Sequence, residues 1–124
     1  YVGYNQLTVL PAKIGNLVGL NWLDLSGNQL TALPPEIGTL TELDSLFLND
    51  NLLTTLPTAI GRLVELTYLG ISNNRLTEIP ESIGRLTKLE GLDLSNNLLM
   101  VLPPDMDGLI TRKVADLSGN PLRL

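Results

Sequence analysis

Residues 20–42 read LNWLDLSGNQLTALPPEIGTLTE, and the same frame returns at residues 43–65, 66–88 and 89–111. The shared pattern is LxxLxLxxNxLxxLPxxIGxLxx, which recurs every 23 residues, since successive units open at positions 20, 43, 66 and 89. Residues 1–19 hold the tail of an earlier unit, and residues 112–124 hold the head of a further one. We therefore predict a single domain of stacked repeats over residues 1–124, and we expect it to be a fragment of a longer chain.

One asparagine occupies the same place in every unit. These residues are Asn5, Asn28, Asn51, Asn74, Asn97 and Asn120. A buried Asn amide can bond backbone groups in its own turn and in the next unit, so we expect the six to form a structural ladder. A proline also recurs at one fixed place, and a proline inside a helix costs about 3 kcal/mol, which argues against a continuous helical repeat.

Each unit contains the features of a short strand followed by a turn. In Leu23-Asp24-Leu25 the two leucines point to one face and the aspartate to the other. Segments such as PPEIGTL then suit a short helical turn, and the glycine after each Ile suits a close approach or a positive φ. Because strands stack more closely than helical turns, the array should curve with its strands on the concave side.

This pattern resembles the leucine-rich repeat family from end to end, and the LPxxIGxL segment is similar to its 23-residue class. That class includes plant intracellular Ras-group-related proteins, Scribble-like scaffolds and the repeat domains of Roco GTPases. The resemblance implies a curved α/β solenoid, with short parallel strands on the concave face and 3₁₀ or short helical turns on the convex face. It also implies a module for protein–protein interaction in signalling or scaffolding.

Composition excludes several other functions. The chain has no His and no Cys, and its glycines follow the repeat instead of a phosphate-loop spacing, so we expect no enzyme activity and no cofactor. A net charge of −5 argues against nucleic acid and anionic membranes as partners, and no apolar run is long enough for a membrane span. The lack of cysteines favours a cytoplasmic location, although the extracellular part of a receptor stays open.

Two kinds of side chain collect at the strand positions that point away from the leucines. All five aromatic residues of the chain are among them: Tyr1, Tyr4, Trp22, Phe47 and Tyr68. So are six acidic residues, opposed only by Lys113: Asp24, Asp44, Asp50, Glu90, Asp93 and Asp116. We predict that these eleven residues bind a protein or peptide with basic and apolar features. The alternatives are cross-strand packing for the aromatics and solubility for the charges.

Three further points stay open at this stage. Asp93 and Asp116 should lie on adjacent strands, but nothing nearby supplies the other ligands of a Ca²⁺ ion, so no metal site is expected. Residues 112–124 look like a C-terminal cap, because Arg112 and Ala115 replace leucines, and the alternative is sequence drift. The alternative functions are a regulatory or structural domain of a larger kinase or Roco-type GTPase, and a self-associating array, so the oligomeric state is open.

Overall fold

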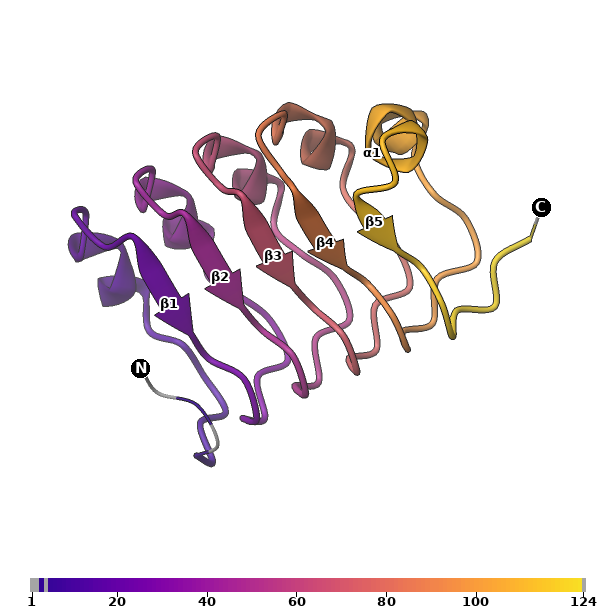
Figure 1. Cartoon of the computed structure of the whole chain (residues 1–124). Helices are drawn as coiled ribbons and strands as arrows, with labels where there is room; N and C mark the ends of the chain where they lie inside the picture. The colour runs from indigo at the N-terminus through magenta and orange to yellow at the C-terminus, as the bar shows by residue number, and fades with distance from the viewer. Residues whose placement is uncertain (1–2, 4, 124) are drawn as a thin grey trace.

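The computed structural model of the chain, which describes residues 3 and 5–123, is a stack of repeat units that share one parallel sheet (Figure 1). The strands are β1 (Trp22–Asp24), β2 (Ser45–Phe47), β3 (Tyr68–Gly70), β4 (Gly91–Asp93) and β5 (Ala115–Asp116), and they neighbour one another in chain order. Each strand crosses to the next through a complete turn of the solenoid. The predicted leucine-rich repeat architecture is confirmed.

The strand register places the leucines of successive units side by side. Leu23 pairs with Leu46, Leu46 with Leu69, and Leu69 with Leu92. All four are buried, together with the leucine or isoleucine two residues further along the chain, just after each strand. One continuous core therefore runs through the stack between the sheet and the helical turns, and each unit buries its apolar face only against its neighbours.

Short helical turns form the opposite side of each unit. Five are 3₁₀ turns: η1 (Ala12–Asn16), η2 (Pro35–Thr39), η3 (Thr58–Arg62), η4 (Glu81–Arg85) and η5 (Pro104–Met106). Each begins directly after a proline in extended conformation, because proline fixes φ near −70° and cannot donate a backbone hydrogen bond. In the last full unit η5 continues into α1 (Asp107–Thr111), and Met106 at the end of η5 takes the buried place of the usual isoleucine.

The glycine that follows each isoleucine is required by close packing. A Cβ on Gly38 would lie 2.9 Å from the carbonyl oxygen of Ala59, and one on Gly61 would lie 2.8 Å from that of Ser82. The positive φ angles fall elsewhere: three residues after each strand, at Gly27, Asp50, Asn73, Asn96 and Gly119, and also at Lys113. Of the two roles expected for the post-isoleucine glycines, close approach to the next helical turn is the one they have.

The asparagine ladder ties each turn to the unit before it. Asn74 accepts a hydrogen bond from the Leu53 amide at 3.0 Å and donates to the carbonyl oxygens of Leu48 at 2.9 Å and Ile71 at 3.2 Å. Asn51, Asn97 and Asn120 repeat this arrangement. The expectation that the amides reach the next unit was wrong, because the backbone that packs against each amide belongs to the preceding unit.

None of the helices in the described chain has the length and apolar character that crossing a membrane requires.

Candidate binding face

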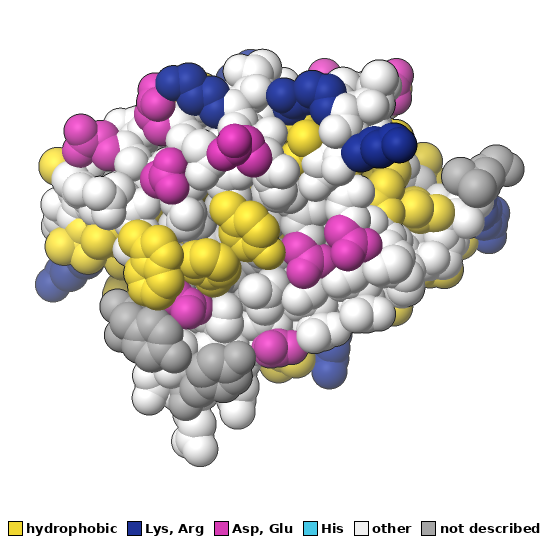
Figure 2. Space-filling model, in the orientation of Figure 1, with side chains coloured by type: hydrophobic (Ala, Val, Ile, Leu, Met, Phe, Trp, Pro, Cys, Tyr) yellow, Lys and Arg dark blue, Asp and Glu magenta, His cyan; other side chains and the backbone are white. Residues whose placement is uncertain are grey.

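The solvent side of β1–β5, which we call the strand face, carries three of the predicted aromatic residues in mutual contact. The ring centroids of Trp22 and Phe47 are 5.5 Å apart, and those of Phe47 and Tyr68 are 5.2 Å apart, with tilted planes. We call these three residues the aromatic row. Figure 2 shows hydrophobic side chains side by side on this face, with acidic groups next to them. The Trp22 side chain is 45% exposed, whereas Phe47 and Tyr68 are half-buried.

The row forms along a diagonal of the sheet. Phe47 stands at the third position of β2, while Trp22 and Tyr68 stand at the first positions of β1 and β3. Ser45 is the direct register partner of both Trp22 and Tyr68, and Phe47 pairs with Asp24 on β1 and Gly70 on β3. Diagonal neighbours in a sheet are within reach of aromatic side chains, and the small Ser45 and Gly70 leave room between the rings of Phe47 and Tyr68.

The Tyr68 ring lies over two glycines. A Cβ on Gly91, its partner on β4, would lie 2.8 Å from Cδ2 of the ring, and a Cβ on Gly70 would lie 3.1 Å from Cε1. The ring therefore occupies the space above β3 and β4 where two side chains would otherwise stand. Neither glycine has a positive φ, so their small size, and not backbone freedom, is what this arrangement needs.

Asp93 and Asp116 lie side by side where the row ends, and we call them the carboxylate pair. They are register partners on β4 and β5. Oδ1 of Asp93 accepts hydrogen bonds from the amide and hydroxyl of Ser95, at 3.0 and 2.6 Å. Oδ1 of Asp116 accepts the equivalent pair from Ser118, at 3.0 and 2.7 Å. The two carboxylates are therefore held in the same orientation.

The same Asp-x-Ser turn recurs at Asp24, whose Oδ1 accepts the Ser26 amide at 2.9 Å. In the third full unit Gly70 replaces the aspartate. There the Asn49 side chain crosses from the preceding unit, and its Oδ1 accepts the amide and hydroxyl of Ser72, at 2.8 and 2.9 Å. A neutral amide thus replaces a carboxylate beside the aromatic row. Sequence reasoning missed this, although Gly70 stands out as a break in the pattern.

Two groups on the strand face have shifted pKa values. Burial raises the pKa of the Tyr68 phenol, and the negative charges of Asp93 and then Asp116 raise it further. The hydroxyl and the amide of Ser118, in that order, hold the pKa of Asp116 below its ordinary value. Tyr68 therefore stays a neutral phenol at physiological pH, and Asp116 stays ionised.

The other predicted residues are spread more widely. Asp44 and Glu90 are exposed beside the strands, and Asp44 accepts a hydrogen bond from the Ser45 hydroxyl at 3.2 Å. Asp50 lies in the turn after β2 with a φ of 59°. Its carboxylate accepts a hydrogen bond from the side-chain amide of Asn73 at 2.8 Å. Asp50 thus forms the turn and links it to the turn of the next unit. Tyr1 and Tyr4 lie outside the described residues.

No group of three or more carboxylates is close enough to hold a metal ion within residues 3 and 5–123.

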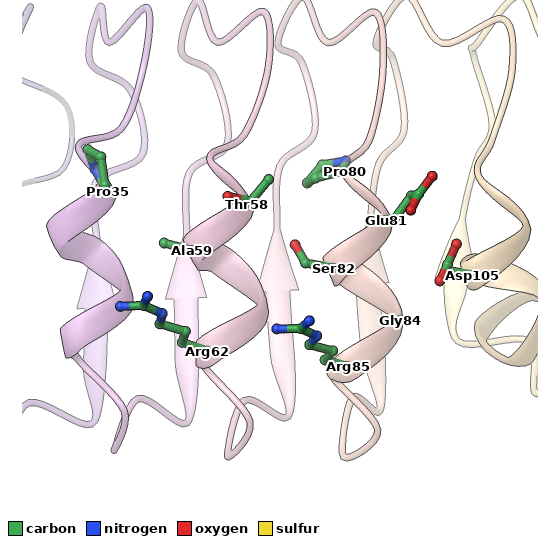
Figure 3. A pocket seen from close by; sticks show the side chains of 10 residues that line it. All are labelled: Pro35, Thr58, Ala59, Arg62, Pro80, Glu81, Ser82, Gly84, Arg85 and Asp105. Carbon is green, nitrogen blue, oxygen red and sulfur yellow. The ribbon is translucent and has the colours of Figure 1, made fainter.

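The convex side of the stack has a hollow of about 810 Å³ that sequence reasoning did not anticipate. Figure 3 shows Arg62 reaching from η3 towards η2, and Arg85 reaching from η4 towards η3. Glu81 and Asp105 also line the hollow, so its charged side chains are balanced in sign. Arginine recurs at the same place in two units of the sequence, and this repetition could have indicated the hollow.

Two family models match the chain: one described as leucine rich repeat, over residues 19–76, and one described as leucine rich repeats in two copies, over residues 64–104. No curated protein matches the chain significantly. Among solved structures it is similar to a leucine-rich repeat protein of Leptospira interrogans, with 40% sequence identity and a TM-score of 0.88. The match covers 97% of this chain and 31% of that one, so this chain spans about a third of the similar protein.

Proposed function

Because the chain is a leucine-rich repeat protein, we propose that it binds a partner protein or peptide on the strand face. Arrays of this family are generally protein-interaction modules. The observation that carries the choice of face is the aromatic row, in which three rings touch across three strands and the outermost ring stays 45% exposed. Exposed tryptophan and tyrosine side chains that lie together are typical energetic centres of interfaces.

Mutual packing of the rings explains only part of their placement. Phe47 contacts a ring on each side, which stabilises the sheet and holds the side chains in one arrangement. A rigid, preorganised aromatic surface also loses little conformational entropy when a partner covers it. Trp22 remains 45% exposed to solvent, and a partner on the strand face would bury this surface.

The charges on the strand face support a partner with basic groups. At the outward strand positions the described acidic residues are opposed only by Lys113, and the carboxylate pair adjoins the aromatic row. A surface of one sign attracts a partner of opposite sign and speeds its association. Because the basic residues of the rest of the chain balance its remaining acidic residues, the convex side lacks this preference.

The test is a selection of random peptides of about twelve residues on the immobilised chain, followed by affinity measurements on the recovered peptides. Trp22→Ala and Phe47→Ala should each weaken binding about tenfold or more, since they remove the contact surface. The matched control is Val64→Ala, because Val64 is also 45% exposed but lies outside the strands. Circular dichroism and thermal unfolding check that each variant stays folded.

The Arg62→Ala variant distinguishes binding on the strand face from binding in the convex hollow. If the recovered peptides bind the Trp22 and Phe47 variants as well as they bind the original chain, the strand-face proposal is wrong. Loss of binding in Arg62→Ala alone would move the site to the hollow between η3 and η4.

A further inference from the structure

The strand face has two chemically different halves that lie in a fixed order. Trp22 and Phe47, on β1 and β2, form an apolar half, and Asp93 and Asp116, on β4 and β5, form an anionic half. Tyr68 on β3 lies between them and contacts the apolar half through Phe47. A ligand that crosses the strands therefore meets apolar surface first and negative charge last, or the reverse.

The carboxylate pair is prepared to receive a cation. The serine hydrogen bonds occupy Oδ1 of both aspartates, and no other hydrogen bond or ion pair to these carboxylates occurs within the described chain. Each Oδ2 therefore remains available to a hydrogen-bond donor. A guanidinium group presents paired donors that suit two carboxylate oxygens at once, and an ammonium group can bridge them.

Tyr68 extends the cation site towards Phe47. The absence of side chains at Gly70 and Gly91 lets the ring lie across β3 and β4, so that it closes the space between Phe47 and Asp93. The charges of both aspartates act on its phenol group, as their effect on the Tyr68 pKa indicates. The aliphatic stem of an arginine or lysine can lie on this ring while its charged end reaches the carboxylates.

The spacing of the two halves limits the ligand. Neighbouring strands are about 4.8 Å apart, so the centre of the Trp22–Phe47 pair and the centre of the carboxylate pair are separated by three strand spacings, about 14 Å. An extended peptide advances about 3.3 Å per residue, which makes this distance about four residues. Residues four apart in an extended chain point to the same side, so both can face the sheet.

We propose that the strand face recognises an extended peptide segment in which a large apolar residue and an arginine or lysine are four positions apart. The apolar side chain packs on Trp22 and Phe47, and the cationic group lies between the Tyr68 ring and the carboxylate pair. This inference rests on the proposed function, because it assigns the partner's chemistry to the same face. A peptide could present these two side chains in either chain direction.

The test uses the random peptide selection described above and reads the sequences recovered. Peptides that depend on Trp22 and Phe47 should be enriched in an apolar and a basic residue separated by four positions. Replacing the basic residue with uncharged citrulline should weaken binding about tenfold, and the double variant Asp93→Asn, Asp116→Asn should lose affinity to a similar degree. Asparagine keeps an acceptor oxygen for each serine, so the turns are preserved.

The control is Asp105→Asn, which removes one charge from the convex side and should leave affinity within about twofold. If peptides depend on Trp22 and Phe47 but carry no basic residue at that spacing, this inference fails and the proposed function stands. If no peptide depends on those two residues, both fail. A dimer that Trp22→Ala abolishes would assign the row to a second copy of the chain and overturn the inference.

Discussion

The buried asparagine side chains hold successive units together, because each bonds backbone groups of two units. Asn51, Asn74 and Asn97 are at most 7% exposed, and each of their amides has both an acceptor and a donor role. Loss of one such side chain leaves a buried amide and buried carbonyls without partners. The cost of each unsatisfied group is about 1–3 kcal/mol.

Asn74→Ala should therefore lower the free energy of unfolding by about 3 kcal/mol, and the melting temperature by roughly 10 °C. The neighbouring residue offers a control, since Asn73 is exposed and has a φ of 56° that glycine adopts readily. Asn73→Gly should change stability by less than about 0.5 kcal/mol. Urea unfolding measures both. Equal effects of the two substitutions would contradict the role assigned to the ladder.

Ser118 should control the ionisation of Asp116. Its hydroxyl and amide lower the pKa of that carboxyl, so the interaction stabilises the folded chain above the unfolded-state pKa and is lost as pH falls through the folded value. Ser118→Ala should raise the pKa of Asp116 part of the way to its ordinary value, since the hydrogen bond from the backbone amide of residue 118 remains. Carboxyl-carbon NMR titration measures this. Ser118→Thr keeps a hydroxyl and should restore the lower pKa; an unchanged pKa in the alanine variant would refute the assignment.

At the scale of the element, the strands and the helical turns stack by different means. The strands are joined by backbone hydrogen bonds, such as that from the Leu48 amide to the Gly70 carbonyl at 2.7 Å. The helical turns pack on one another through backbone contact at Gly15, Gly38, Gly61 and Gly84. Within the described residues no helical turn follows the one that contains α1, and a Cβ added to Gly108 would have nothing within 4 Å.

Two glycine-to-alanine substitutions in helical turns should therefore have opposite effects. A Cβ on Gly61 would lie 2.6 Å from Cβ and 2.8 Å from the carbonyl oxygen of Ser82, so Gly61→Ala should destabilise the chain by about 1–3 kcal/mol. Gly108→Ala adds a methyl group in open space within α1 and should stabilise the chain by up to about 1 kcal/mol. Thermal unfolding of both variants distinguishes them, and a shift of the same sign in each would argue against the packing described.

At the scale of the whole molecule, charge is separated between the two sides of the solenoid. Six acidic residues and one lysine at the outward strand positions leave −5, which equals the net charge of the chain. Every acidic residue of this set is at least partly exposed to solvent. We therefore expect the charge of the strand face to attract a basic partner, over a distance that depends on the salt concentration.

Association with a basic peptide should accordingly be sensitive to ionic strength. Raising the salt concentration from about 0.05 M to about 0.5 M should slow association about tenfold and change dissociation much less. Stopped-flow fluorescence of Trp22, the chain's single tryptophan, follows the reaction. The Asp93→Asn, Asp116→Asn variant should show a weaker salt dependence. An association rate that is independent of salt in the original chain would exclude electrostatic guidance.

The sequence alone determined the repeat register, the fold and the side of the sheet on which each strand residue lies. A strict 23-residue period aligns equivalent residues of every unit, and the two-residue alternation of a strand decides which of them face solvent. Both are local or periodic properties, so they can be predicted from one chain. The structure confirmed the architecture and placed Trp22, Phe47 and Tyr68 on one face.

Only the tertiary structure decided which residues of that face touch. The diagonal contacts of Phe47, the position of the Tyr68 ring over Gly91, and the replacement of a carboxylate by Asn49 all cross from one unit to another. The hydrogen bonds of the ladder asparagines also cross between units, towards the preceding one. Such contacts depend on how neighbouring units are offset and on which rotamers the space between them admits, and a repeat pattern read one unit at a time contains neither.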